Sequence, residues 1–195
     1  MVRPLLAALI ISVIQMTAQG DKSVLAGSTD IAGVKSWAKG DLSLNTQDEA
    51  YGKIIKVLSR AGIKTYLNRE ACLKNQIVGT YNPTISAIIL CTNRMKVFAD
   101  DSREYEDLLA STIAHEAIHV AQYCRSRNLG IPYLGVRAGA LYALPESVQS
   151  DIKKSMKVAN YSTPRSVAWR IEAEAYYHER RPEEVIQHIN SNCLP

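Results

Sequence analysis

The 195-residue sequence lacks the clusters of basic residues that would indicate a nucleic-acid-binding protein. Its 23 Lys and Arg residues are scattered along the chain and outnumber the 19 Asp and Glu residues only slightly, for a net charge of +4. Binding to a phosphate backbone normally requires basic residues gathered on one face or along one helix. We therefore expect no nucleic-acid partner and a mildly basic, solvated surface.

Long apolar runs are missing beyond the first twenty residues, so we expect no stable insertion into a membrane. At the N-terminus, Arg3 supplies a positive charge, and residues 5–14 form an apolar stretch with the length of a signal-peptide core. The stretch ends at Gln15, and small residues follow in Ala18-Gln19-Gly20. We predict that residues 1–20 are a signal peptide, with retention as an anchor left open, and that the protein is secreted or periplasmic.

The sequence also lacks a CxxC spacing, which argues against a zinc site built from cysteines. Four cysteines in an exported chain favour disulfides, and they allow three connectivities that sequence alone cannot separate. We favour Cys72–Cys91, which would brace two strands beside a turn, and Cys124–Cys193, which would tie the C-terminal tail to a central helix.

We expect residues 21–195 to form one domain, because no internal repeat, low-complexity tract or linker interrupts them. The fold class that we predict is α+β, mostly helical, with a small antiparallel or mixed sheet beside a long buried helix. A loop is expected at residues 130–144. The expected helices are 47–61, 103–127, 145–158, 163–180 and a short one from 182, and the expected strands are 63–67, 76–81 and 86–92, of which the last two form a hairpin.

The chemistry is concentrated in His115-Glu116-Ala117-Ile118-His119, in the middle of the long helix. Positions i and i+4 share a helix face, so His115 and His119 can bind one metal ion, and imidazole nitrogens are good ligands of Zn²⁺. Glu116 lies beside such an ion, where it can accept a proton from metal-bound water and pass it to the leaving amine. We therefore predict a zinc cofactor and Glu116 as the general base.

A catalytic zinc ion requires a third protein ligand, and Glu172-Ala173-Glu174-Ala175 supplies the candidates. With HEAIH followed by this E-x-x-A segment, the chain resembles the gluzincin metallopeptidases. The resemblance implies Glu172 as the third metal ligand, with Glu174 as the less favoured alternative. The family usually continues with Asp or Asn, where this chain has Tyr176. The metzincin pattern fails, because its third histidine would stand at Arg125.

The resemblance to small gluzincins covers residues 45–180 and implies a peptide or protein substrate. Such a substrate would bind in extended form along the hairpin around Tyr81 and Ile85. Two other functions stay open: an exported zinc-binding protein with a degenerate site, and a zinc amidase that acts on cell-wall material. The oligomeric state is not predicted. The candidates for stabilising an oxyanion are Tyr133, Tyr142, Tyr176, Tyr177 and His178.

Overall fold

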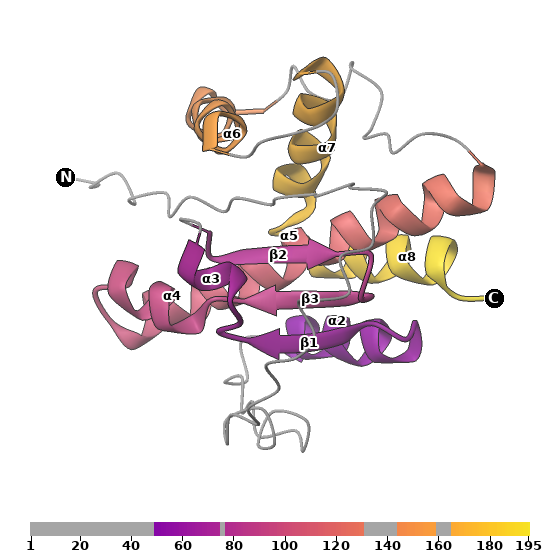
Figure 1. The fold of residues 1–195 in the computed structure, drawn as a ribbon, viewed down its shortest axis with the longest axis horizontal. Helices are drawn as coiled ribbons and strands as arrows, with labels where there is room; N and C mark the ends of the chain where they lie inside the picture. Colours follow the sequence, from indigo (N-terminus) through magenta and orange to yellow (C-terminus); the bar gives the residue numbers. More distant parts are fainter. Residues whose placement is uncertain (1–48, 75–76, 131–143, 159–164) are drawn as a thin grey trace.

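The computed structural model describes residues 49–74, 77–130, 144–158 and 165–195 (Figure 1). The predicted signal peptide lies outside the described residues, and so do residues 131–143 of the predicted loop with Tyr133 and Tyr142. In chain order the elements are α2 (Glu49–Arg60), β1 (Lys64–Leu67), α3 (Ala71–Lys74), β2 (Gly79–Asn82), β3 (Ala87–Leu90), α4 (Thr92–Phe98), α5 (Ser102–Leu129), α6 (Glu146–Val158), α7 (Arg165–His178) and α8 (Pro182–Cys193). The predicted α+β class, mostly helical with a small sheet, is confirmed.

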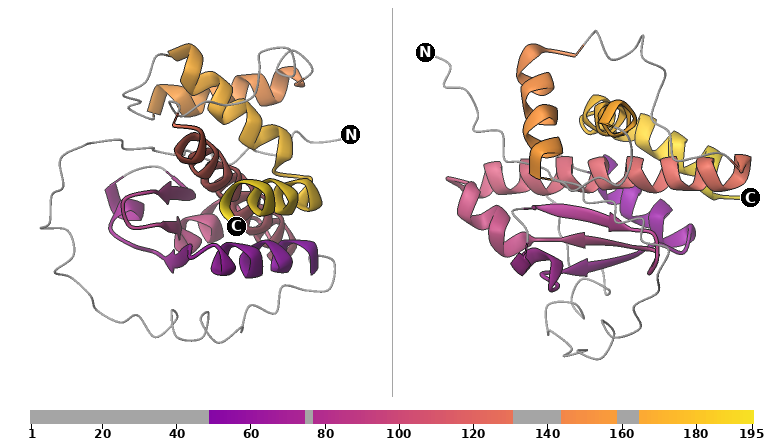
Figure 2. Two further views of the ribbon diagram at one scale, coloured as in Figure 1. Left: turned by 90° about the vertical axis from the view of Figure 1, so that its right-hand side faces the viewer. Right: turned by 45° about the horizontal axis from the view of Figure 1, so that its top comes forward.

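Helix α5 is the axis of the fold, and every residue from 112 to 122 is buried. It begins where the Asp101 side chain accepts a hydrogen bond from the Glu104 backbone N–H, and it ends at Gly130 in the left-handed conformation. In the right-hand view of Figure 2, α5 runs between the sheet below it and α7, seen end-on above it. The predicted central buried helix is therefore confirmed, and it contacts the sheet as well as α2, α4, α7 and α8.

The sheet has the strand order β1-β3-β2, with β1 parallel and β2 antiparallel to the central β3. The predicted hairpin is β2 and β3. All four residues of β3 are buried, because the strand is covered on both faces. Ile88 and Leu90 face the core that also contains residues of α2 and α5, whereas Ile89 packs with Cys72 and Ile77 on the other face. A continuous apolar run is typical of such a strand.

Two disulfides join the predicted cysteine pairs, Cys72–Cys91 and Cys124–Cys193. One detail of the prediction was wrong, since neither cysteine of the first pair lies in a strand: Cys72 is in α3, and Cys91 follows β3 at the start of α4. The second disulfide connects α5 to the last residue of α8 across a sequence separation of 69 residues, which holds α8 along the central helix. Disulfides persist in oxidising compartments, so the pair suggests an extracytoplasmic environment. None of the helices within the described ranges is long and apolar enough to cross a membrane.

The short helices α3 and α4 were not predicted. Helix α4 buries a single large apolar side chain, Met95, while Val97 is 80% exposed and Phe98 is 44% exposed. One buried anchor in seven residues produces no helical periodicity in the sequence. In Figure 1 these two helices lie next to each other at the left-hand end of the sheet, away from α7.

Glycine at position 79 is required by the close contact between β2 and α5. A Cβ atom there would collide with the Thr112 side chain and stand 3.2 Å from Cγ and Oε1 of Glu116. We expect Gly79→Ala to lower the free energy of unfolding by about 1–3 kcal/mol, because an added methyl in a filled site forces its neighbours apart. Urea denaturation followed by circular dichroism measures this change.

Gly52 on α2 is the matched control, because a Cβ atom there meets nothing within 4 Å. Gly52→Ala is expected to raise stability by about 0.5–1 kcal/mol, since alanine is the better helix former. Equal stability changes in the two variants would show that the contact between Gly79 and α5 is looser than described.

Candidate metal centre

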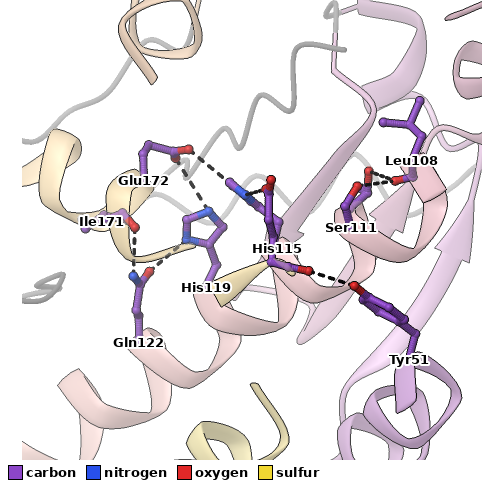
Figure 3. A network of polar contacts seen from close by, with 10 residues as sticks. Tyr51, Leu108, Ser111, His115, His119, Gln122, Ile171 and Glu172 are labelled. Atoms are coloured by element: carbon purple, nitrogen blue, oxygen red, sulfur yellow. Dashed lines mark hydrogen bonds and ion pairs between the residues drawn. The ribbon is translucent and has the colours of Figure 1, made fainter. Parts of the chain in front are cut away.

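Three buried donor side chains converge between α5 and α7: His115, His119 and Glu172. Within the described part of the chain they are the one group of His, Cys, Asp and Glu residues found with donor atoms all within 4.8 Å of one another. Nε2 of His115 lies 3.4 Å from Glu172 Oε2, and Nε2 of His119 lies 3.7 Å from Glu172 Oε1. Figure 3 shows Glu172 directed from α7 toward the two imidazole rings.

The two distances from the histidines to Glu172 are close to those between ligands of one metal ion. Donors bound tetrahedrally at 2.0–2.2 Å from one ion stand about 3.3–3.6 Å apart. All three side chains have 0% exposed surface, and so does Glu116. Burying two imidazoles and two carboxylates together is costly without a compensating charge. The group could therefore hold a divalent cation, with two ligands from α5 and one from α7.

The electrostatics of the two histidines differ. Burial alone would lower the pKa of His115, but hydrogen bonds to the Glu172 and Glu179 carboxylates outweigh this effect and raise the pKa to about 10. Burial lowers the pKa of His119 to about 4, although the Glu172 carboxylate opposes the shift. The ligand of a metal ion is the neutral imidazole, so metal binding competes with the proton that the two carboxylates favour on His115.

The second ring nitrogen of each histidine has its own support. Nδ1 of His115 faces Glu179 Oε2 at 3.3 Å, and Nδ1 of His119 faces Gln122 Oε1 at 2.9 Å. In metal sites such contacts fix the orientation of the ring and leave Nε2 for the metal. Glu179 is itself held at its backbone carbonyl, which accepts a hydrogen bond from the Tyr51 hydroxyl at 3.3 Å.

Glu179 and Gln122 were missed in the sequence. The gluzincin pattern directed attention to position 176, where Tyr176 packs its ring edge-on against His115 with centroids 4.8 Å apart. Glu179 stands about two helical turns after Glu172, just past the end of α7. Gln122 follows His119 at i+3 on α5, a spacing that places the two side chains on one helix face.

Glu174, the alternative ligand, lies away from the histidines. Its carboxylate is paired with both terminal nitrogens of Arg125, at 3.0 and 2.9 Å, and accepts a hydrogen bond from Gln122 at 2.8 Å. Side chains two residues apart on a helix point in different directions, so only one of Glu172 and Glu174 can reach the histidines. The structure brings Glu172 to them.

The general-base candidate, Glu116, lies next to the donor group and against the sheet. Its Cγ and Oε1 atoms stand 3.2 Å from the place that a Cβ atom of Gly79 would occupy, so its carboxylate is next to the first residue of β2. The carboxylate is also close enough to His115 to raise the pKa of that imidazole. The Glu116 side chain thus lies between strand β2 and the donor group.

The remaining candidates of the sequence have other surroundings. His178 is buried at the end of α7, where Nδ1 lies 2.9 Å from Glu184 Oε2, and its pKa is lowered by burial and by His188. The Tyr177 ring is covered by the Arg181 guanidinium at 3.9 Å. Tyr81 is 1% exposed, so its side chain belongs to the core rather than to a groove.

Comparison with known proteins identifies the family but no activity. The family described as "Domain of unknown function (DUF8637)" matches residues 42–194. The chain belongs to this family. The matched range of the DUF8637 domain contains every residue of the candidate metal centre and both disulfides. No curated protein matches the chain, and no solved structure matches it.

Proposed function

We propose that this protein is an exported zinc metallopeptidase of the gluzincin type, in which His115, His119 and Glu172 bind Zn²⁺ and Glu116 is the general base. The observation that carries the proposal is the convergence of three buried donors with the glutamate of the HEAIH motif beside them. Two imidazoles and one carboxylate are a ligand set typical of catalytic zinc, and they leave a fourth position for water or substrate.

When bound, the zinc ion would lower the pKa of a water molecule and polarise the scissile carbonyl. The residues of the chain supply the rest. His115 and His119 present neutral Nε2 atoms, since Glu179 and Gln122 hold the opposite ring nitrogens. Glu116 accepts the proton of the attacking water and delivers it to the leaving amine. Its place inside the protein keeps this proton out of exchange with bulk solvent.

The sheet favours a peptide as the substrate. Within the described ranges β2 pairs with β3 alone, so β2 is an edge strand. At its first residue, Gly79, a Cβ atom would stand 3.2 Å from the Glu116 carboxylate oxygen Oε1. An extended peptide that adds to an edge strand is held by main-chain hydrogen bonds, and here one end of the strand lies beside the proposed base. This arrangement favours the cleavage of peptide bonds over that of other amides.

The complete burial of the donors also suits a metal site without catalysis, so the experiment must separate the two. The purified protein is analysed for metal, stripped with a chelator, and reloaded with Zn²⁺. Each form is incubated with a mixture of synthetic peptides and, separately, with peptidoglycan, and the products are read by mass spectrometry. We expect about one zinc ion per chain and peptide cleavage that disappears with the metal and returns with it.

Each alternative outcome contradicts the proposal in its own way. Zinc without cleavage of either substrate indicates a non-catalytic metal site. Cleavage restricted to amide bonds of peptidoglycan indicates a cell-wall amidase. A folded protein that binds no zinc removes the metal from the function altogether.

A further inference from the structure

The contacts around His119 form a chain of polar groups that extends from α5 to α7 and back. Gln122 Oε1 lies 2.9 Å from His119 Nδ1. The amide nitrogen of Gln122 donates to the Ile171 carbonyl at 3.0 Å and to Glu174 Oε2 at 2.8 Å. Glu174 is in turn paired with the guanidinium of Arg125. Gln122 and Glu174 are each only 1% exposed, so bulk water does not compete for these hydrogen bonds.

The chemistry of the end groups determines the direction of every hydrogen bond in this chain. A backbone carbonyl can only accept, and so can a carboxylate that is paired with a guanidinium. The Gln122 amide must therefore donate both of its hydrogens to Ile171 and Glu174, which leaves its oxygen toward His119. An amide oxygen accepts but cannot donate, so His119 must carry its hydrogen on Nδ1. The lone pair of the neutral ring is then on Nε2, the atom that faces Glu172.

Gln122 also connects the two halves of the donor group. It contacts the ligand His119 on its own helix and the carbonyl of Ile171, the residue before the ligand Glu172. A side chain that holds both contacts limits how far α7 can shift along α5. Figure 3 shows Gln122 reaching from α5 to Ile171 while it lies below the His119 ring.

We propose that Gln122, anchored by the Glu174–Arg125 ion pair, is a positioning residue of the metal centre. It selects the Nδ1–H tautomer of His119 and fixes the distance between the two ligands of α5 and the ligand of α7. Glu174 thereby has a role outside the coordination sphere. This positioning role affects metal binding directly. It affects peptide cleavage only if the peptidase function proposed above holds.

The first test replaces Gln122 by methionine, which has a similar volume and no amide. Residues that orient metal ligands typically contribute 10–100-fold to metal affinity. We expect Gln122→Met to bind Zn²⁺ about 10–100-fold more weakly in competition with a chromophoric chelator. Ser126→Ala is the matched control, because it removes from the same helix a buried hydroxyl whose hydrogen bond goes to the Tyr123 carbonyl, one turn back on α5. It is expected to bind zinc as the wild type does.

The second readout is the tautomer itself, which a merely structural side chain would leave unchanged. Two-bond ¹⁵N–¹H spectra of the metal-free protein are expected to show His119 as the Nδ1–H form in the wild type and as a mixture in Gln122→Met. A folded Gln122→Met protein with wild-type zinc affinity and an unchanged His119 tautomer would overturn the proposal. Because the spectra need no metal and no substrate, this outcome is separate from a failure of the proposed peptidase activity.

A charge swap keeps the test informative if methionine prevents folding. Gln122→Glu alone places two carboxylates together at positions 122 and 174, so zinc binding is expected to fall. Adding Glu174→Gln restores a donor amide opposite the new carboxylate, which can still accept from His119 Nδ1. The double variant is expected to recover part of the lost affinity, because the new carboxylate accepts from His119 but cannot donate to the Ile171 carbonyl. A double variant that binds zinc no better than Gln122→Glu contradicts the role of position 174 as the anchor of residue 122.

Discussion

Glu116→Gln is expected to reduce peptide hydrolysis by about 10²–10⁴-fold, the usual contribution of a general acid–base group. Glutamine has nearly the same shape and fits the space between α5 and Gly79, but it cannot accept the proton of the attacking water. Glu116 is not among the three residues whose donor atoms converge, so the zinc content should not change. The measurement is kcat/KM on a cleaved peptide together with the metal content of the same sample.

Glu106→Gln makes the same chemical change in the first part of α5, where the side chain is half-buried and remote from the donor group. Wild-type activity is expected for this control. If Glu116→Gln retains zinc and also full activity, Glu116 is not the base, and the cleavage arises elsewhere or by another mechanism. If Glu116→Gln loses zinc, the glutamate supports the metal site rather than the proton transfer.

Helix periodicity in the sequence was sufficient to predict the two metal-ligand candidates that α5 contributes. His115 and His119 stand at i and i+4 on a helix, and the spacing alone brings their rings to one face. The third donor depends on how α7 packs against α5, which no local pattern contains. The E-x-x-A segment favoured Glu172, and the structure brings Glu172 to the histidines. The pairing of Glu174 with Arg125 depends on that same packing and was not predicted.

The residues that contact Nδ1 of the two histidines were not predicted from the sequence. The gluzincin pattern places the supporting carboxylate or amide directly after E-x-x-A, and this chain has Tyr176 there. The carboxylate comes instead from Glu179, beyond the end of α7, where the chain turns back toward α8. For His119 the support comes from its own helix through Gln122. Both positions become visible only once the two helices are placed side by side.

In the fold, the elements with strong periodicity were predicted and the short ones were not. The long helices and the hairpin have several buried apolar residues each. Helices α3 and α4 have one or two, and these pack outside their own helix: Cys72 against Ile89 of the sheet, and Met95 in the core that also contains residues of α5. The parallel pairing of β1 with β3 also depends on tertiary structure, since it joins segments that are separated by α3 and β2.

The second large effect concerns the third ligand. Zinc at about 100 times its dissociation constant stabilises the wild-type protein by about 2.7 kcal/mol, since it binds the folded state. For a chain of this size that corresponds to a rise in melting temperature of roughly 5–10 °C. Glu172→Ala leaves two imidazoles without the carboxylate that joins them, and we expect no rise at the same zinc concentration. Thermal unfolding with and without zinc measures the difference.

Two further glutamate variants allow the roles of three glutamates to be compared by the same rise in melting temperature. Glu183→Ala changes an exposed side chain of α8 and is expected to show the full wild-type rise. Glu174→Ala removes the anchor of Gln122, and a 10–100-fold weaker affinity would leave only about 0.4–1.4 kcal/mol of stabilisation. The rise in melting temperature is therefore expected to decrease from Glu183→Ala to Glu174→Ala to Glu172→Ala. This order distinguishes a residue without a role, a positioning residue and a metal ligand. If Glu174→Ala abolishes the rise while Glu172→Ala keeps it, the two roles are exchanged. In that case α7 must turn relative to α5 when the metal binds, because in the structure the Arg125 guanidinium holds Glu174 away from the histidines.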